Sequence, residues 1–415
     1  MVFAAFLDSL SMAVKKPKRV LLKQSRMRRV LLALLPCMAG AVYFFGWRSL
    51  AMVLWAGAVG FAVEYIFTRH RGEPVTESVF VTTTILALIM PPTAPWHVLT
   101  IGTVFAVMFT KEIFGGFGRN FFNPAMAGRC FVYVCFPVAM TAVWSAPAEG
   151  TWGALDRWTT ASAESNAQRE GAEPEPLPQP PPRDVPTLSP PSVPQALTTA
   201  TPMAYLKLGQ VVLVSKETAG NEPAAEGERV QSTTPGFQPP LSRVPFDIPE
   251  EQIVRVDRDS FWKQLFLGRV SGTMGVTSVL LILIGGLYLF FSKTASRTII
   301  LTIVLTYALL SQILYWAGVQ PVPSGVTALL GGGWLFGAFF MATDPVSAPK
   351  TELGRGLYAA LIAVCSVVIR NFSIFNGGLM FSILIGNMFA PIIDYAVRAH
   401  AAAAAGKRTE KEAVV

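Results

Sequence analysis

The chain has 415 residues, of which 52% are hydrophobic and 14% charged, and this balance excludes an ordinary soluble globular protein. Its formal net charge is +8, but the densest basic cluster, from Lys15 to Arg29, directly precedes the first apolar run. A basic segment at that position indicates membrane topology, and we expect no nucleic-acid partner. We expect no cleavable signal peptide either, because no small-residue cleavage site precedes Arg29.

The apolar residues gather into runs of about 20 residues, the length that a helix needs to cross a hydrocarbon core. Ten runs predict ten transmembrane helices, near 29–47, 49–68, 78–90, 97–113, 124–145, 273–291, 298–318, 323–342, 355–370 and 377–396. The expected fold class is therefore an all-α integral membrane protein.

The ten runs form two groups of five that share features. The third run of each group ends in a proline-broken turn, Met90–Pro95 in one and Met341–Pro349 in the other, and the fourth leads into the glycine pairs 115–116 and 377–378. Because five crossings is an odd number, such repeats must be inverted in the membrane. We therefore predict two inverted five-helix repeats with broken helices, a plan that places a binding site near the midplane. The alternative is that proline and glycine only kink packed helices.

Charge asymmetry between the short connections predicts the topology. With the basic N-terminus inside, the connections expected in the cytoplasm carry Lys and Arg, whereas those expected outside carry little beyond Arg48 and Arg370. We expect a multi-pass protein of a bacterial inner membrane, surrounded by lipid, with both termini cytoplasmic. The expected parts are a basic N-terminal segment (1–28), the first repeat (29–146), a periplasmic Pro-rich loop (147–260), the second repeat (261–397) and a cytoplasmic tail (398–415).

The sequence predicts neither a cysteine-bound iron–sulfur or zinc site nor a dinucleotide-binding site for NADH. The cysteines, Cys37, Cys130, Cys135 and Cys365, fall inside apolar runs without a CxxC pair, so we interpret them as buried small hydrophobes. No GxGxxG motif follows a strand, since Gly115–Gly118 lies between membrane helices, and NADH oxidation must therefore belong to a partner.

Three motifs resemble signatures of the B subunit of the sodium-translocating NADH:quinone reductases: Gly118–Arg129, Phe339–Ala348 and Asn387–Asp394. The resemblance covers essentially all ten runs and fades in the N-terminal tail and most of 147–260. The D subunit of the related ferredoxin-oxidising RNF complex shares the fold and some motifs. The Ala-Gly-Arg after the Asn-Pro motif and the Ala-Pro-Ile-Ile-Asp near the end look more like the quinone reductase.

The resemblance implies a membrane subunit that relays electrons from covalent FMN through riboflavin to ubiquinone, coupled to sodium export. The chain itself would hold no catalytic residue and would position the flavins, which do the redox chemistry. The implied partners are an NADH-oxidising flavin and iron–sulfur subunit, a second FMN-carrying subunit and small membrane subunits. Alternatives are an RNF-type D subunit, or a non-redox ten-helix solute transporter, because inverted repeats are also a transporter plan.

The implied attachment point of FMN lies in the 147–260 loop. Thr201 matches the last Thr of the family's flavinylation motif, which carries FMN through a phosphoester. This chain departs from the motif at two positions, with Thr199 where Gly is usual and Gln195 where an Asp usually opens it. Thr198 and Thr199 are alternative acceptors, and an unmodified Thr-rich turn is the alternative to a flavin site.

Asn120 and Asn123 are the residues implied to bind riboflavin. Their spacing of three would place both side chains on one helix face, and an amide can hydrogen-bond the edge of an isoalloxazine ring. The family places a non-covalent riboflavin at this element. Asn and Pro are also favoured at a helix start, so they could instead cap the fifth helix, and both roles can coexist.

Few acidic residues lie near or within the apolar runs: Glu64, Glu77, Glu112, Asp344 and Asp394. An ionisable group at membrane depth indicates function. The spacing of Gly60 and Glu64 resembles the family's region near its quinone site, although Phe61 stands where a second Gly is common. Glu64 and Asp394 are also candidate sodium ligands; the alternative for each is a solvated carboxylate near the cytoplasmic edge. Asp344 is expected to cap exposed backbone amides.

A further departure from the family lies at the start of the sixth run. Val276 stands between Gly275 and Thr277 where the family commonly has Glu.

Overall fold

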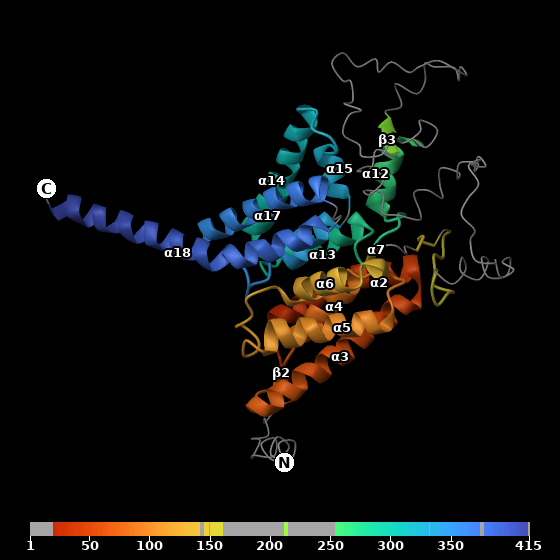
Figure 1. The fold of residues 1–415 in the computed structure, drawn as a ribbon, viewed down its shortest axis with the longest axis horizontal. Coiled ribbons are helices and arrows are strands. Elements are labelled where there is room, and N and C mark those ends of the chain that lie inside the picture. Colours follow the sequence, from red (N-terminus) through yellow and green to blue (C-terminus); the bar gives the residue numbers. More distant parts are fainter. Residues whose placement is uncertain are drawn as a thin grey trace, which may run out of the picture.

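The computed structural model describes residues 20–141, 145–148, 150–160, 211–214, 254–331, 333–373 and 377–413 (Figure 1). Most of these residues are helical, which confirms the all-α membrane class. Five helices are long and apolar enough to cross a membrane: α2 (Ser25–Phe45), α3 (Trp47–Arg71), α14 (Arg297–Trp316), α17 (Glu352–Phe372) and the Gly378–Ala404 part of α18 (Gly378–Ala413). Ten crossings, inverted repeats and the five-part division stay predictions. Thr198, Thr199, Gln195 and Thr201 lie outside the described residues.

Shorter elements complete the two halves. The first half also contains α4 (Ser78–Leu88), α5 (Trp96–Val107), the π-helix η1 (Met108–Glu112), α6 (Pro124–Cys135) and α7 (Pro137–Thr141). The second also contains α12 (Arg258–Leu267), α13 (Val279–Phe291), α15 (Gly325–Leu330), α16 (Trp334–Phe336) and the π-helix η3 (Gly337–Met341). Two short parallel strand pairs join β1 (Leu21–Leu22) to β2 (Val75–Thr76) and β3 (Val211–Val214) to β4 (Val254–Asp257).

Three predicted helices are interrupted or shortened in the structure, and the run at 124–145 is one of them, because it is divided into α6 and α7 at Phe136. The run at 273–291 becomes helical only at Val279, because Ser278 caps α13 and the preceding backbone bonds to the end of α4 instead. There Gly275 N donates to Leu88 O at 2.7 Å, and Met274 N donates to Met90 O at 3.2 Å. The run at 323–342 is divided into α15, α16 and η3, with Gly333 in the left-handed conformation at the break. Before α13, irregular backbone therefore lies inside the protein, and the end of α4 and the residues after it satisfy part of it.

The two halves pack directly on each other. In Figure 1 helices α2 to α6 form one group and helices α13 to α18 form a second group beside it. Across the boundary, α13 packs on α2 and α18 packs on α6. A Cβ atom on Gly285 of α13 would overlap the carbonyl oxygen of Ala33 on α2. Glycine therefore allows these two helices to approach closely between the halves.

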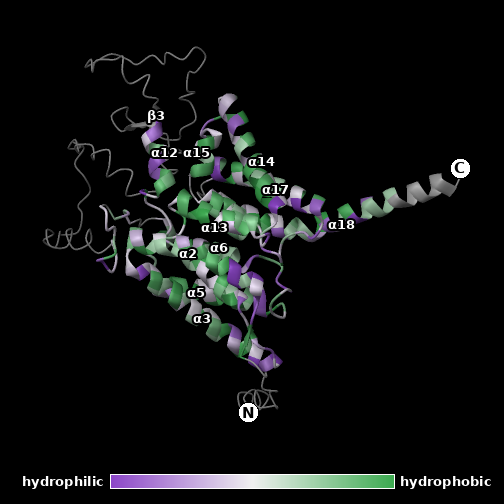
Figure 2. Ribbon diagram, turned by 180° about the vertical axis from the view of Figure 1, so that it is seen from behind, coloured by the Kyte–Doolittle hydropathy of each residue, from purple (hydrophilic) through white to green (hydrophobic). Residues whose placement is uncertain are grey.

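Large apolar side chains also cover the outer surface. Leu301, Leu305 and Leu309 repeat every four residues along α14 and are all more than half exposed. Figure 2 shows hydrophobic colour along the helices and hydrophilic colour mainly at their ends, with α18 continuing beyond the other helices. An apolar outer face of this kind suits a lipid environment, which together with the five long apolar helices identifies a multi-pass membrane protein. The inner membrane and the cytoplasmic termini stay predictions.

Candidate functional site

A pocket opens between the two halves, with about 770 Å³ of empty space that includes its open mouth. The first half contributes the start of α2 and of α4, the end of η1 and the loop that leads into α6. The second half contributes the end of α13, the end of η3 and the turn after η3. Asn120 and Asn123, which the family resemblance implies as riboflavin-binding residues, both line this pocket.

Asn123 caps α6 and ties it to the second half. Its side-chain oxygen accepts hydrogen bonds from Ala125 N at 3.1 Å and Met126 N at 3.3 Å, and Pro124 begins the helix. Its Nδ2 donates to Met341 O at the end of η3, at 3.0 Å. The capping interpretation is therefore confirmed, and the same amide also links the two halves.

Asn387, supported by Tyr358, holds the backbone of Asn123, and neither was among the site residues expected from the sequence. Tyr358 of α17 is hydrogen-bonded to the side-chain amide of Asn387 on α18 at 2.8 Å, and both are buried. With the amide oriented to satisfy every partner, Asn387 donates to Tyr358 Oη and accepts from Asn123 N at 2.8 Å. An Asn inside an apolar run was the available signal, because an amide at that depth needs partners.

Asn120 reaches the pocket from a loop. Its Nδ2 donates to Phe122 O at 3.1 Å, and it lies four residues before the first helical residue, Pro124. The prediction that Asn120 and Asn123 share one helix face is therefore wrong, because Asn123 itself is the cap that precedes the helix. The left-handed turn at Gly118, with φ of 88°, precedes Asn120 in this loop.

The pocket lining fits a flavin ring in its chemistry. Apolar contacts come from Ile85, Leu289 and Phe340, and hydrogen-bonding groups come from Thr82 and Asn120. An isoalloxazine ring has apolar faces and an edge of carbonyl and ring-nitrogen groups, so it needs both kinds of wall. Binding sites for such ligands combine a mainly apolar lining with a few placed polar groups.

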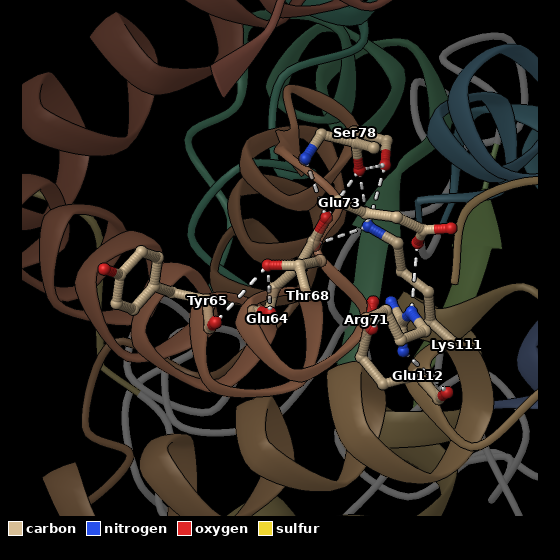
Figure 3. Close-up of polar contacts among 9 residues, drawn as sticks. Glu64, Tyr65, Thr68, Arg71, Glu73, Ser78, Lys111 and Glu112 are labelled. Atoms are coloured by element: carbon tan, nitrogen blue, oxygen red, sulfur yellow. Dashed lines mark hydrogen bonds and ion pairs between the residues drawn. The ribbon is translucent and has the colours of Figure 1, made fainter. Parts of the chain in front are cut away.

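A buried ion pair lies beside the pocket (Figure 3). Lys111 Nζ of η1 lies 2.5 Å from Glu64 Oε2 of α3. The ammonium also donates to Thr76 Oγ1 at 2.8 Å and Ser78 Oγ at 2.9 Å. The second carboxylate oxygen of Glu64 accepts from Thr76 N at 2.8 Å and from Thr76 Oγ1 at 2.6 Å. All three ammonium protons and both carboxylate oxygens are therefore engaged.

This ion pair corrects one interpretation of Glu64. Its exposed fraction is 0% and that of Lys111 is 2%, so Glu64 is not a solvated carboxylate at the membrane edge. In the sequence, Lys111 is one of the basic residues that place the connection after the fourth run in the cytoplasm, and its pairing with Glu64 was not expected. The signal for its role was an ammonium at the end of an apolar run, where an unpaired charge would be costly.

A second ion pair lies next to the first. Arg71, at the end of α3, pairs with the buried Glu112 of η1 and also with Glu73 at 3.0 Å. Glu112 Oε1 is buried and has no hydrogen-bond partner among the residues that the structure describes. The π-helical turn of η1 buries Lys111 and Glu112 in succession, and π-helical turns occur frequently at functional sites.

Gly60 lies one helical turn before Glu64 and faces α4. A Cβ atom there would overlap Thr83 Cγ2 and lie 3.2 Å from Val79 Cγ2, so glycine is needed for close packing of α3 on α4. The neighbouring Phe61 stacks on Tyr65 and on Phe80, with ring centroids 6.1 Å apart in both pairs. The quinone role of Gly60 and Glu64 stays a prediction.

The two candidate sodium ligands belong to separate networks. Asp394 of α18 accepts from Lys350 N at 2.8 Å, from Thr351 N at 3.0 Å and from Thr351 Oγ1 at 2.6 Å. Because Thr351 is the N-cap of α17, Asp394 attaches the start of that helix to α18. The sodium role of Glu64 and Asp394 stays a prediction, but each carboxylate already has a structural one.

Asp344 lines the pocket and caps its own turn. Its Oδ1 accepts from Val346 N at 3.2 Å and its Oδ2 accepts from Ser347 Oγ at 2.8 Å. The prediction that this carboxylate satisfies exposed backbone amides is confirmed.

The four cysteines are all free thiols. Cys37 is buried as expected, Cys130 and Cys365 are partly buried, and Cys135, at the end of α6, is exposed. The interpretation of Cys135 as a buried residue is therefore wrong. An apolar run in a membrane protein has an outward face that contacts lipid, so hydrophobic surroundings do not require burial within the chain.

Known proteins resemble the chain over most of its length. A family model described as the NQR2, RnfD, RnfE family matches residues 18–403. The D subunit of the ion-translocating oxidoreductase complex of Shewanella amazonensis is 29% identical over 380 residues, 90% of this chain and 92% of that protein. The protein of the same name from Alcanivorax borkumensis is 31% identical over 376 residues, 89% of each chain. The B subunit of the Na(+)-translocating NADH-quinone reductase of Chromohalobacter salexigens is 31% identical over 361 residues, 86% of this chain and 66% of that protein.

Proposed function

Because this chain belongs to the NQR2, RnfD, RnfE family, we propose that it is a membrane subunit of an ion-translocating oxidoreductase complex and relays electrons within it. Family membership favours this redox role over a non-redox solute transporter. The partners are then the other subunits of the complex, including the one that oxidises the soluble electron donor.

The pocket between the two halves is the observation that carries the redox proposal. Asn120 and Asn123 line it together with apolar side chains, as a riboflavin ring would require. Asn123 is fixed by Met341 of the second half and by its own helix, so a ring bound there would contact a rigid amide. Rigid placement matters because the protein supplies position and electrostatics while the flavin supplies the redox chemistry.

The full proposed relay uses three places in the chain. Thr201 carries FMN through a phosphoester, Asn120 and Asn123 hold riboflavin, and Gly60 and Glu64 lie near ubiquinone. Electrons enter from a flavin of a neighbouring subunit, and their passage is coupled to sodium export, for which Glu64 and Asp394 are the proposed ligands.

A second candidate is an RNF-type D subunit, because relatives of both names match the chain at about 30% identity. At similar identity the chain covers 92% of the Shewanella protein but 66% of the Chromohalobacter protein. The electron donor separates the two candidates. Membranes containing the complex should reduce ubiquinone with NADH in the first case, and should reduce NAD with reduced ferredoxin in the second.

Flavin analysis of the purified complex tests the proposal. The denatured chain should fluoresce under ultraviolet light, and this fluorescence should be lost in Thr201→Ala and retained in the matched variant Thr198→Ala. Riboflavin released by denaturation should be lost in an Asn120→Ala/Asn123→Ala variant that still assembles. A colourless complex, with no mass shift on the 147–260 loop and no released riboflavin, would contradict the redox role.

A further inference from the structure

Lys111 connects the pocket to the buried ion pair. It lines the pocket together with Ser78 and Asn120, and its ammonium lies 2.5 Å from Glu64 Oε2. The pocket proposed for riboflavin and the carboxylate proposed to lie near the quinone are therefore joined by one cation.

The pocket wall carries two other charged side chains, Arg26 and Asp344. Arg26 is exposed, so solvent and salt screen its charge. Asp344 is a carboxylate fixed by Val346 N and Ser347 Oγ, so its negative charge cannot stabilise further negative charge in the pocket. Lys111 is almost fully buried, and a charge in such a low-dielectric setting acts strongly on its neighbours.

The ammonium is also fixed in place. Its donors go to Glu64, Thr76 and Ser78, and the two hydroxyls are themselves 2.8 Å apart. A charge held by such a network need not reorganise when a new charge appears nearby, which is the condition for effective electrostatic stabilisation.

We propose that Lys111 stabilises the negative charge that a flavin ring in the pocket gains with one electron, and that Glu64 opposes this effect. The inference rests on the proposed function. The electron comes from a one-electron donor, the reduced FMN that the proposed function places on Thr201, which a flavin of a neighbouring subunit has reduced. No covalent bond forms or breaks, the donor is oxidised by one electron, and Lys111 keeps its protons.

The two members of the pair should therefore have opposite effects. Removing Lys111 takes away the positive charge near the ring and disfavours the first electron. Removing the negative charge of Glu64 leaves the positive charge of Lys111 less compensated, which favours uptake of the first electron by the ring. A purely structural ion pair would give no reason for effects of opposite sign.

Potentiometric titration of the non-covalent flavin in the purified complex provides the test. In Lys111→Met the equilibrium for the first electron should shift against reduction by about tenfold, or about 59 mV. Glu64→Gln should shift it in the opposite direction, and Lys111→Arg should resemble the unmodified protein. The control is Lys263→Met, which removes an exposed lysine of α12 outside the pocket and should change nothing.

Each outcome has a defined meaning. Unchanged potentials in Lys111→Met and Glu64→Gln, or shifts of the same sign in both, would overturn the inference while leaving the flavin pocket intact. Should Lys111→Met fail to assemble, Glu64→Gln decides alone, and no shift or a shift against reduction overturns the inference. Absence of non-covalent flavin from the unmodified complex would instead overturn the proposed function.

Discussion

Lys111 of η1 and Glu64 of α3 form an ion pair of 2.5 Å in which neither side chain reaches the surface. Charges that are buried in this way stabilise a protein only while both partners are present, because the remaining partner must otherwise stay uncompensated. The pair therefore attaches the end of α5 and η1 to α3, beside the pocket.

Breaking this pair from one side should destabilise the protein strongly. We expect Lys111→Met to lower the free energy of unfolding by about 3–5 kcal/mol, the usual effect of leaving a buried charge unpaired. The double variant Lys111→Met/Glu64→Gln should be more stable than Lys111→Met, because no charge remains buried alone. Thermal unfolding in detergent measures both, with Lys263→Met as the control. A double variant less stable than both single variants would contradict this account.

Asn123 should be distinguishable from Asn120 by stability. Asn123→Ala removes the cap of α6 and the bond to Met341 O, and should lower stability by about 1–3 kcal/mol. Asn123→Asp keeps the accepting oxygen of the cap but loses the donor, so α6 should keep its start while the link to the second half weakens. Asn120→Ala removes only the bond to Phe122 O and should cost less. Equal losses in Asn120→Ala and Asn123→Ala would contradict the linking role.

The helices were predictable because apolar run length and flanking charge depend on local sequence. The runs at 49–68 and 355–370 correspond closely to α3 and α17, whose ends carry polar residues. The break inside 323–342 had a local signal in the three consecutive glycines 331–333, whereas the π-helical turn η3 depends on contacts with other helices. Local patterns could also place Asn123 at a helix start, because its side chain caps the backbone N–H groups of residues only two and three positions later.

The side-chain contacts of Glu64 and Asp394 could not be predicted from the sequence, because their partners are distant along the chain. Glu64 and Lys111 are 47 positions apart, and nothing in either run indicates that the two side chains meet. Asp394 and Thr351 are 43 positions apart in the same way. Charged residues near the ends of apolar runs look alike in sequence whether they face solvent or each other, so only the packing of the helices distinguishes a solvated carboxylate from a buried pair.

Asp394 offers a test that separates a structural carboxylate from a sodium ligand. Asp394→Asn keeps one accepting oxygen, so part of the attachment to Lys350 N and Thr351 should be lost, lowering stability by about 1–3 kcal/mol. If Asp394 also binds sodium, half-maximal quinone reduction should require more sodium in this variant, and likewise in Glu64→Ala. An unchanged sodium dependence in both variants would remove these residues from the ion path.

Glu77 should make the attachment of α2 sensitive to acid. Its carboxylate accepts from Gln24 N at 2.6 Å and from Arg28 Nη2 at 2.6 Å. The side-chain hydrogen bond from Arg28 lowers the pKa of Glu77 below its ordinary value of 4.5, against the opposing effect of burial. A lowered pKa in the folded state means that this stabilisation is fully present above pH 4.5 and is lost as the pH falls through the folded-state value.

Glu77→Gln should accordingly be less stable than the unmodified protein at neutral pH, and the difference should shrink as the pH falls below 4.5. Melting temperatures measured between about pH 3 and about pH 7 provide the check. The control is Glu73→Gln, since Glu73 is half exposed and contacts only Arg71 by ion pairing among the residues that the structure describes. A difference that stays constant with pH would show that the carboxylate charge of Glu77 is not what holds α2.

Gly60 and Gly57, one helical turn apart on α3, form a matched pair for testing close packing against α4. A Cβ atom at Gly60 would overlap Thr83 Cγ2, whereas at Gly57 the nearest atom is Phe80 Cδ1 at 3.9 Å. We expect Gly60→Ala to lower stability by about 1–3 kcal/mol through overpacking. Gly57→Ala should be neutral or stabilising, because alanine favours a helix more than glycine does. If Gly60→Ala folds with unchanged stability yet impairs quinone reduction, Gly60 acts at the quinone rather than in helix packing.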